Sequence, residues 1–376
     1  MSKTSQSNNP IFNSNKFKLG TFATNTIGAA QTLAPDAYVP TWENSLRIAR
    51  MADRAGFEAI LGLARWRNPD VPIEGRSNVV MDSFTWSAGL AMATEYSALF
   101  ATSHAPTVHP LVIAKQCATI DHISGGRFGL NVVGGWNQHE FDMFGLKLLE
   151  HDKRYDYLEE WMAVLYKLWE GTEEFDYDGK FLKLRGALSR PQTVQKPHIP
   201  ILNAGMSPRG QRFACEYADC CFVTSRISKD DIQSYKKMAR EEFGREVGIW
   251  MSVPITQRRT RQEAEEAADY FVVEYEDRLA VDGIQAGAVS DTRTLKNEPT
   301  KFSRRIIALG GEPVLGSATD IADQLEALSD KGVDGILISW ASFDDGMMRF
   351  TEEVLPLLEK RGLREPFNPA PKKQGL

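Results

Sequence analysis

The sequence of 376 residues lacks the patterns that mark several common functional classes. It contains neither GxxxxGK[ST] nor GxGxxG, which disfavours ATP binding and dinucleotide binding of the Rossmann type. It has no run of about 18 apolar residues that could span a membrane, and its polar start shows no hydrophobic signal-peptide region. We therefore expect a cytoplasmic protein without a membrane segment.

Patterns for metal binding, disulfides and nucleic-acid binding are also absent. The four cysteines, Cys117, Cys215, Cys220 and Cys221, form no CxxC pair, so we expect them to be reduced and mostly buried. The six histidines show no HExxH, which predicts no metal site and disfavours a metal-dependent barrel hydrolase. A net charge of −6 argues against nucleic acid, whose phosphates require clustered Lys and Arg. A small molecule is the expected ligand.

What the sequence does have is an apolar run, a turn and an amphipathic segment, repeated along most of its length. This alternation indicates a parallel sheet covered by helices. The expected strands are residues 17–23, 59–63, 97–102, 127–133, 199–203, 220–224, 248–253 and 335–339. This number of strands predicts a closed (β/α)8 TIM barrel, an α/β fold.

The domain organisation follows from the segments that do not fit this repeat. We expect a disordered start at 1–16, one barrel domain at 17–364 and an extended tail at 365–376. Helices are expected at 44–55 and 155–169, and Ser317 with Asp320 resembles a capping box. Two insertions stand out: 170–197, with a small hairpin turn outside the barrel, and 282–313, an irregular stretch expected to act as a lid.

Polar residues near the predicted strand ends are the candidates for chemistry, because ligand sites of parallel α/β folds lie there. Asn131 interrupts the apolar run in SGGRFGLNVVGGW (residues 124–136), Thr102 closes the third strand, and Arg65 follows the second. Ser207 opens a helix after a glycine turn. A helix start of this kind offers N–H groups to a phosphate, although an ordinary N-cap explains Ser207 equally well.

On these motifs the sequence resembles the bacterial luciferase-like flavin monooxygenases, in particular the pyrimidine monooxygenase branch and its dimethylsulfone relatives. The resemblance rests on ATIDHISGGRFGLNVVGGW (118–136), NQHEFDMFG (137–145), HDKRYDYLEEWMAVLYKLW (151–169) and LNAGMSPRGQRFACEYAD (202–219). It extends from about residue 18 to the last helix. The spacing of SGGRFGLNVVGGW and RYDYLEE is specific for the family and much less so for a substrate.

The resemblance implies an oxidoreductase that takes reduced FMN from a separate NAD(P)H:flavin reductase and uses O₂ as co-substrate. Its flavin contacts correspond to Ala64, Arg65, Asn131, Glu140, Arg154, Tyr155, Ser207 and, in the turn before it, Gly205. Thr102 and Asn131 match the pair that holds O₂ beside flavin N5 in the pyrimidine branch, so N5-oxygen chemistry is implied. Gly134 and Gly135 are expected to let the flat ring approach the backbone.

For the substrate, His104 and Trp136 are the candidate contacts, and the expected class is a small heterocycle, amide or organosulfur compound. His104 stands where the pyrimidine branch is less polar, so uracil does not follow from the resemblance. A deazaflavin-dependent dehydrogenase of the same superfamily and a non-catalytic flavin-binding protein remain alternatives. Relatives usually associate, so a homo-oligomer, a dimer or tetramer, is expected.

Overall fold

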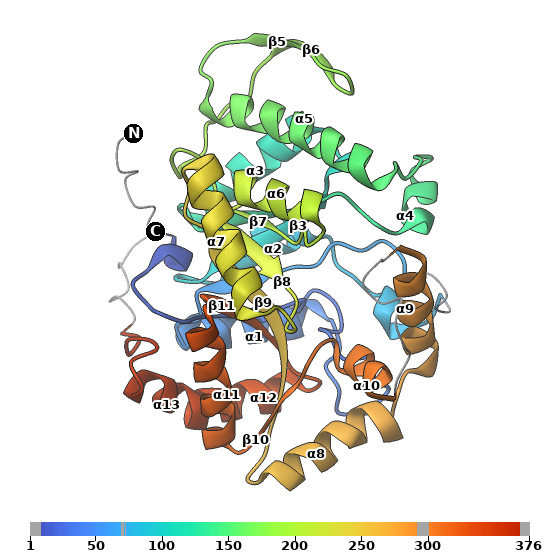
Figure 1. Ribbon diagram of the computed structural model, residues 1–376, viewed down its shortest axis with the longest axis vertical. Helices are drawn as coiled ribbons and strands as arrows, with labels where there is room; N and C mark the ends of the chain where they lie inside the picture. Colours follow the sequence, from blue (N-terminus) through green and yellow to red (C-terminus); the bar gives the residue numbers. More distant parts are fainter. Residues whose placement is uncertain (1–8, 69–70, 72, 292–300, 369–376) are drawn as a thin grey trace.

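A computed structural model describes residues 9–68, 71, 73–291 and 301–368 of the chain (Figure 1). The strands are β1 (Lys18–Phe22), β2 (Ala59–Leu61), β3 (Ala98–His104), β4 (Phe128–Val133), β5 (Phe175–Asp178), β6 (Lys183–Ala187), β7 (Ile201–Asn203), β8 (Cys220–Val223), β9 (Gly248–Gln257), β10 (Val314–Gly316) and β11 (Gly335–Ser339). The α-helices are α1 (Trp42–Arg54), α2 (Ser83–Ala91), α3 (Pro110–Ser124), α4 (Gln138–Met143), α5 (His151–Glu170), α6 (Pro208–Tyr217), α7 (Lys229–Phe243), α8 (Arg261–Asp269), α9 (Arg278–Asp291), α10 (Lys301–Leu309), α11 (Ala318–Lys331), α12 (Phe343–Arg349) and α13 (Leu355–Lys360). Short 3-10 turns are η1 (Pro10–Phe12), η2 (Arg76–Asn78) and η3 (Ala105–Thr107), and π turns are η4 (Tyr270–Glu274) and η5 (Phe350–Val354).

Eight parallel strands close into a barrel in the order β1-β2-β3-β4-β7-β8-β9-β11, with β11 pairing back onto β1. Every expected strand is present, and the (β/α)8 TIM barrel is confirmed. Strand β10 was not expected: it extends the sheet by pairing with the far end of β9. Because all barrel strands are parallel, their carboxyl ends meet at one mouth, where the candidate residues lie.

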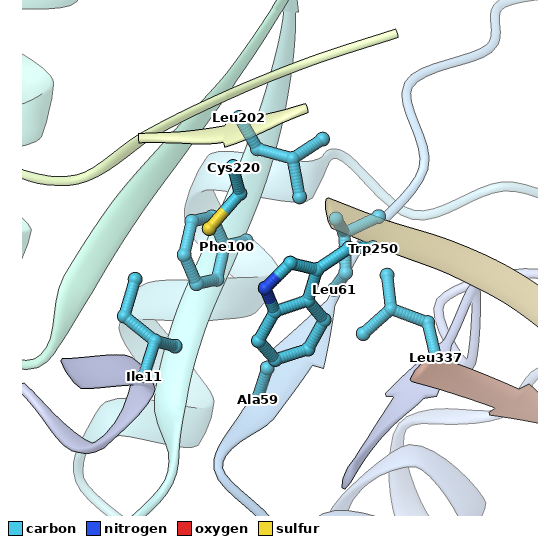
Figure 2. Close-up of a pocket in the computed structure, with 8 residues that line it drawn as sticks. All are labelled: Ile11, Ala59, Leu61, Phe100, Leu202, Cys220, Trp250 and Leu337. Atoms are coloured by element: carbon cyan, nitrogen blue, oxygen red, sulfur yellow. The ribbon is translucent and has the colours of Figure 1, made fainter. Parts of the chain in front are cut away.

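The lower interior of the barrel is an apolar floor. Figure 2 shows Trp250 of β9 surrounded by Phe100, Leu202 and Leu337 from other strands, with Ile11 below them. These side chains leave no room for a water molecule between them. Ligand chemistry therefore belongs to the mouth above this floor.

The start of the chain is more ordered than the sequence suggested. Residues 1–8 lie outside the described residues, but η1 follows them, and Ile11 is only 4% exposed beneath the barrel. Asn9 caps this turn by accepting the N–H of Ile11, and its amide donates to Gln195. An apolar plug for the open bottom of the barrel explains why the expected disorder over 1–16 is wrong from residue 9 onward.

The end of the chain also packs against the bottom of the barrel. Arg364 forms a fully buried ion pair with Glu58, at 3.1 Å between Nη1 and Oε2. Glu58 also accepts from the Leu19 N–H at 2.8 Å, and Phe367 packs on the ring of Tyr96. Of the expected extended tail, residues 369–376 lie outside the description.

The two insertions have different outcomes. The hairpin near residue 179 is present as antiparallel β5 and β6, which lie over α5 outside the barrel (Figure 1). The irregular stretch expected at 282–313 is instead partly helical, since α9 and α10 occupy most of it and bury Val281, Ala308 and Leu309 in one cluster. Residues 292–300 lie outside the described part, and a lid role stays a prediction.

Candidate active site

The alternation of side chains along β3 places polar groups above the apolar floor. Leu99 and Ala101 pack in the clusters between barrel and helices, whereas Phe100 belongs to the interior cluster. Successive side chains of a strand point to opposite faces, so Thr102 and His104 face the interior like Phe100. Both are buried, with 4% and 7% of their surfaces exposed.

Asn131 lies opposite Thr102 in the parallel register of β3 and β4. Its neighbours Leu130 and Val132 pack toward the helices, so the amide faces inward. The amide Nδ2 donates to Thr102 Oγ1 at 3.1 Å, and that hydroxyl donates to the carbonyl oxygen of Gly62 at 2.7 Å. The remaining amide oxygen, Asn131 Oδ1, is buried and has no hydrogen-bond partner among the described residues.

His104 lies beside a buried carboxylate. Its Nδ1 is 3.6 Å from Glu140 Oε2, and both side chains are less than a tenth exposed. Burial lowers the pKa of His104, Glu140 opposes this shift, and the nearby cation of Arg65 adds to it. The imidazole is therefore neutral at pH 7. Burial also lowers the pKa of Arg65, against the effect of Glu140, although part of the Arg65 side chain reaches solvent.

Glu140 also holds the loop that follows β2. Its Oε1 accepts from the backbone N–H groups of Trp66 at 2.8 Å and Arg67 at 3.3 Å. Asn137, the N-cap of α4, donates from Nδ2 to the Arg67 carbonyl at 3.2 Å. The ring of Trp66 meets Phe144 edge to face, with centroids 5.2 Å apart. The loop after β2 and α4 thus form one wall of the mouth.

The glycine pair at the exit of β4 has a reason within the protein itself. Gly135 has φ +75°, and a Cβ at this position would lie 2.4 Å from a ring carbon of Phe141. A Cβ on Gly134 would lie 3.1 Å from Leu158. Arg154 Nη1 donates to the carbonyl of Gly135 at 2.6 Å. Close packing of α4 and α5 on this exit requires bare backbone, and approach of a ligand ring stays a prediction.

A second group of candidates gathers where α5 and α6 begin. Ser207 is the N-cap of α6 and accepts the Gly210 N–H at 3.0 Å, so the ordinary capping role is present. A Cβ on Gly210 would lie 2.4 Å from the hydroxyl of Tyr155, which places that hydroxyl against the first turn of α6. Gly205 precedes the cap, with its N–H bonded to Asn203 Oδ1 at 2.8 Å. Tyr155, Gly205 and Ser207 are therefore brought together at a helix N-terminus.

Two candidates lie outside these buried groups. The indole of Trp136 is 44% exposed on the loop after β4, and Ala64 is half-buried on the loop after β2. The expected contacts of Ala64 with the flavin and of Trp136 with the substrate stay predictions.

The sequence reading overlooked three residues at the mouth. Phe22 of β1 and Phe222 of β8 project inward and stack at 6.1 Å between centroids, as half-buried rings. The alternation of inward-facing and outward-facing residues along β1 and β8 could have identified these two rings. Asn25 ties the loop after β2 by accepting from the Leu63 N–H at 2.9 Å and donating to the carbonyls of Leu63 and Met81. A single asparagine in an irregular loop gives no such signal.

The described part of the chain has no feature of a metal site or of a membrane span. No group of three or more His, Cys, Asp or Glu side chains there could hold a metal ion. None of its helices is both long and apolar enough to cross a membrane. All four cysteines are buried free thiols.

A parallel eight-stranded barrel with polar side chains at the carboxyl ends of its strands has the architecture of the TIM-barrel enzymes. Within that class, the family model described as luciferase-like monooxygenase matches residues 17–335, and the chain belongs to this family. The resemblance drawn from the motifs is thereby confirmed, and the chain is an enzyme, a flavin-dependent monooxygenase.

Individual proteins are similar to this chain in sequence or in fold. A pyrimidine monooxygenase RutA of Allorhizobium ampelinum is 31% identical over 350 residues, covering 86% of this chain and 91% of that protein. Two solved structures share the fold over 94% of this chain: riboflavin lyase RcaE, with a TM-score of 0.82 and 22% identity, and long-chain alkane monooxygenase LadA, with 0.81 and 24%. The matched regions cover 94% of the RcaE chain and 93% of the LadA chain.

Proposed function

We propose that this chain is the oxygenating component of a two-component system. It takes reduced FMN from a separate NAD(P)H:flavin reductase and uses O₂ to oxygenate a small organic molecule, a heterocycle, amide or organosulfur compound. Bound reduced flavin supplies the electrons for O₂ activation, while the protein orients the reactants and excludes water.

The observation that carries this proposal is the unpartnered Asn131 Oδ1 at the mouth of the barrel. A buried acceptor without a partner is unfavourable unless a ligand donates to it, and the N–H groups of a reduced flavin ring are suitable donors. Thr102 fixes the amide from the neighbouring strand. Arg65 and the half-buried Ala64 lie on the loop that follows β2, shortly after Gly62, whose carbonyl accepts from Thr102.

The phosphate of FMN fits the group at the starts of α5 and α6. At the N-terminus of α6, Pro208 has no N–H and the Gly210 N–H is bonded to Ser207 Oγ, so the donors offered to an anion are the Arg209 N–H and the hydroxyl of Ser207. Tyr155 adds a phenol against the same turn, and Arg154 adds a cation beside the exit of β4. Gly205 keeps the turn before Ser207 compact, because a side chain there would collide with the backbone of Gly210.

The substrate side of the mouth combines apolar rings with one polar group. Phe22 and Phe222 provide flat apolar surface, which suits a small planar or compact molecule. His104, neutral and held near Glu140, offers a hydrogen bond to a carbonyl, N–H or sulfonyl group. Trp136, exposed on the loop after β4, is the residue that we expect to cover such a molecule from the solvent side.

The deciding experiment couples purified protein to a flavin reductase, NADH and FMN under ¹⁸O₂. A pyrimidine, a simple amide and an organosulfone are supplied separately, and mass spectrometry measures ¹⁸O in the products. One ¹⁸O atom in a product from any of these supports the proposal. Turnover that yields only hydrogen peroxide with every compound contradicts the proposed substrate class.

The alternatives give different results in a parallel titration without oxygen. Binding of a reduced deazaflavin, with no binding of reduced FMN, indicates a dehydrogenase. Binding of FMN without any reaction of the bound reduced flavin with O₂ indicates a non-catalytic flavin-binding protein. The reductase partner, the cytoplasmic location and homo-oligomer formation stay predictions until such preparations are made.

A further inference from the structure

The hydrogen bonds around Thr102 fix where its hydrogen points. The oxygen atoms of the Thr102 hydroxyl and the Gly62 carbonyl are 2.7 Å apart. A carbonyl has no hydrogen to give, so the hydroxyl must be the donor. The Gly62 backbone is held against β3, because the Gly62 N–H donates to the Phe100 carbonyl at 2.9 Å. The Thr102 hydroxyl hydrogen is therefore not available to a ligand.

The assignment of donor and acceptor at Thr102 also fixes the orientation of the Asn131 side-chain amide. Having used its one hydrogen, Thr102 Oγ1 can only accept from Asn131, and the atom at 3.1 Å must be the amide nitrogen. The opposite orientation would place two acceptors against each other. Asn131 Oδ1 is thus left as an acceptor without a partner, buried in a side chain that is 8% exposed.

No neighbouring polar group in the described mouth satisfies this oxygen. His104, two residues beyond Thr102 on the same strand, has its Nδ1 3.6 Å from Glu140 Oε2. The pair expected to hold O₂ beside flavin N5 therefore offers one donor, the second hydrogen of Asn131 Nδ2, and one open acceptor, Asn131 Oδ1. Of these two atoms, the buried Oδ1 is the one that can receive an N–H group.

We propose that Asn131 Oδ1 selects the redox state of the bound flavin by accepting the hydrogen on N5. This inference rests on the proposed function. N5 carries a hydrogen in reduced FMN and a lone pair in oxidised FMN, so the fixed acceptor attracts the first form and opposes the second. Thr102 is a positioning residue in this scheme, because it holds the amide in the accepting orientation.

The test is anaerobic equilibrium titration with reduced FMN and, separately, oxidised FMN, without any substrate. The wild-type protein should bind reduced FMN about 10-fold more tightly or better, the scale of one net hydrogen bond. A 10-fold preference raises the two-electron midpoint potential of bound FMN by about 30 mV relative to free FMN, which spectroelectrochemistry measures independently.

Three variants separate the mechanism from a loss of packing. Asn131→Leu should weaken the binding of reduced FMN about 10-fold, and the binding of oxidised FMN should be unchanged or tighter. Thr102→Val should also lower the preference for reduced over oxidised FMN, because the Asn131 amide is then free to rotate. Thr102→Ser keeps the hydroxyl and should keep this preference. Ser103→Ala is the matched control, since Ser103 is a buried hydroxyl between Thr102 and His104 that faces the helices.

The outcomes distinguish this inference from the proposed function. Equal weakening of both redox forms in Asn131→Leu overturns the inference while the FMN site stands. Selective weakening of the oxidised form also overturns it, because the second hydrogen on Asn131 Nδ2 would then be the contact. Absence of wild-type FMN binding in either redox state removes the proposed function itself.

Discussion

At the scale of the residue, the sequence identified which positions at the mouth are polar, and the structure determined what their atoms can do. Thr102 and Asn131 were found because a hydroxyl and an amide ended apolar runs. Their direct hydrogen bond depends on the register of β3 and β4, which places them opposite each other. Register between strands distant in sequence is set by barrel closure, so it could not be predicted locally.

The proposed phosphate end of the site leads to a residue-scale prediction about ligand choice. Arg154→Met should weaken the binding of FMN about 10-fold to 100-fold, the scale of a charge-assisted hydrogen bond. It should change the binding of riboflavin by less than about twofold. Riboflavin lacks the phosphate, so it reports on ring binding alone. Fluorescence titration of both ligands checks this. Lys153→Met, on the exposed side of the same turn, is the control. An equal loss for both ligands would place Arg154 away from the phosphate.

His104 leads to a prediction about pH. Burial lowers its pKa in the folded protein, so the unfolded chain takes up a proton first as pH falls. The stability due to neutral His104 is present above about pH 6.5 and is lost as pH falls toward the folded pKa, by up to about 1.4 kcal/mol per pH unit. Urea unfolding from pH 5 to 8 should show His104→Gln losing less stability than wild type below about pH 6.5. Parallel profiles would contradict this.

At the scale of the element, the wall formed by α4 and the loop after β2 depends on one carboxylate. Glu140→Ala should leave the Trp66 and Arg67 N–H groups without their acceptor and cost about 1–3 kcal/mol. Glu140→Gln keeps an acceptor and should retain the loop. Hydrogen exchange of peptides covering residues 62–68 measures this, with the exposed Asp142→Ala on α4 as control. Unchanged exchange in Glu140→Ala would show that the loop is held by other contacts.

The helices α9 and α10, within the stretch predicted to be irregular, were elements that sequence reading missed. The segment RLAVDGIQAGAVSD of α9 contains mostly small residues, so its apolar stripe is faint. Its helical form is supported by tertiary contacts: Val281 packs with Phe271 and Ala308, and Arg304 of α10 pairs with Glu276 and Asp282. Elements with strong local signals, such as α5 and the capping box of Ser317 and Asp320, were predicted correctly.

At the scale of the whole molecule, the barrel is closed from below by the two ends of the chain. The expected strand count and order gave the barrel correctly, because alternating strands and helices admit few other arrangements. The plug by Ile11 and the buried pair of Glu58 and Arg364 were not predictable, since each joins residues that are far apart in sequence and show no periodic pattern.

The buried pair provides the prediction at this scale. Arg364→Met should destabilise the protein by about 3–5 kcal/mol, because it leaves the Glu58 carboxylate buried without its cation. The double variant Arg364→Met/Glu58→Gln should recover part of the loss. Urea unfolding measures both, and Lys16→Met, which removes an exposed pair with Asp330, should change stability by less than about 1 kcal/mol. A loss for Arg364→Met as small as that control would contradict the prediction.

The most direct test of the central claim is a crystal structure of this protein grown without oxygen in the presence of reduced FMN. The account predicts the ring at the barrel mouth with N5 within hydrogen-bond distance of Asn131 Oδ1, and the phosphate at the N-terminus of α6 beside Ser207 and Tyr155. A mouth left empty, or a ring bound with Asn131 and Thr102 turned away from it, would contradict the account.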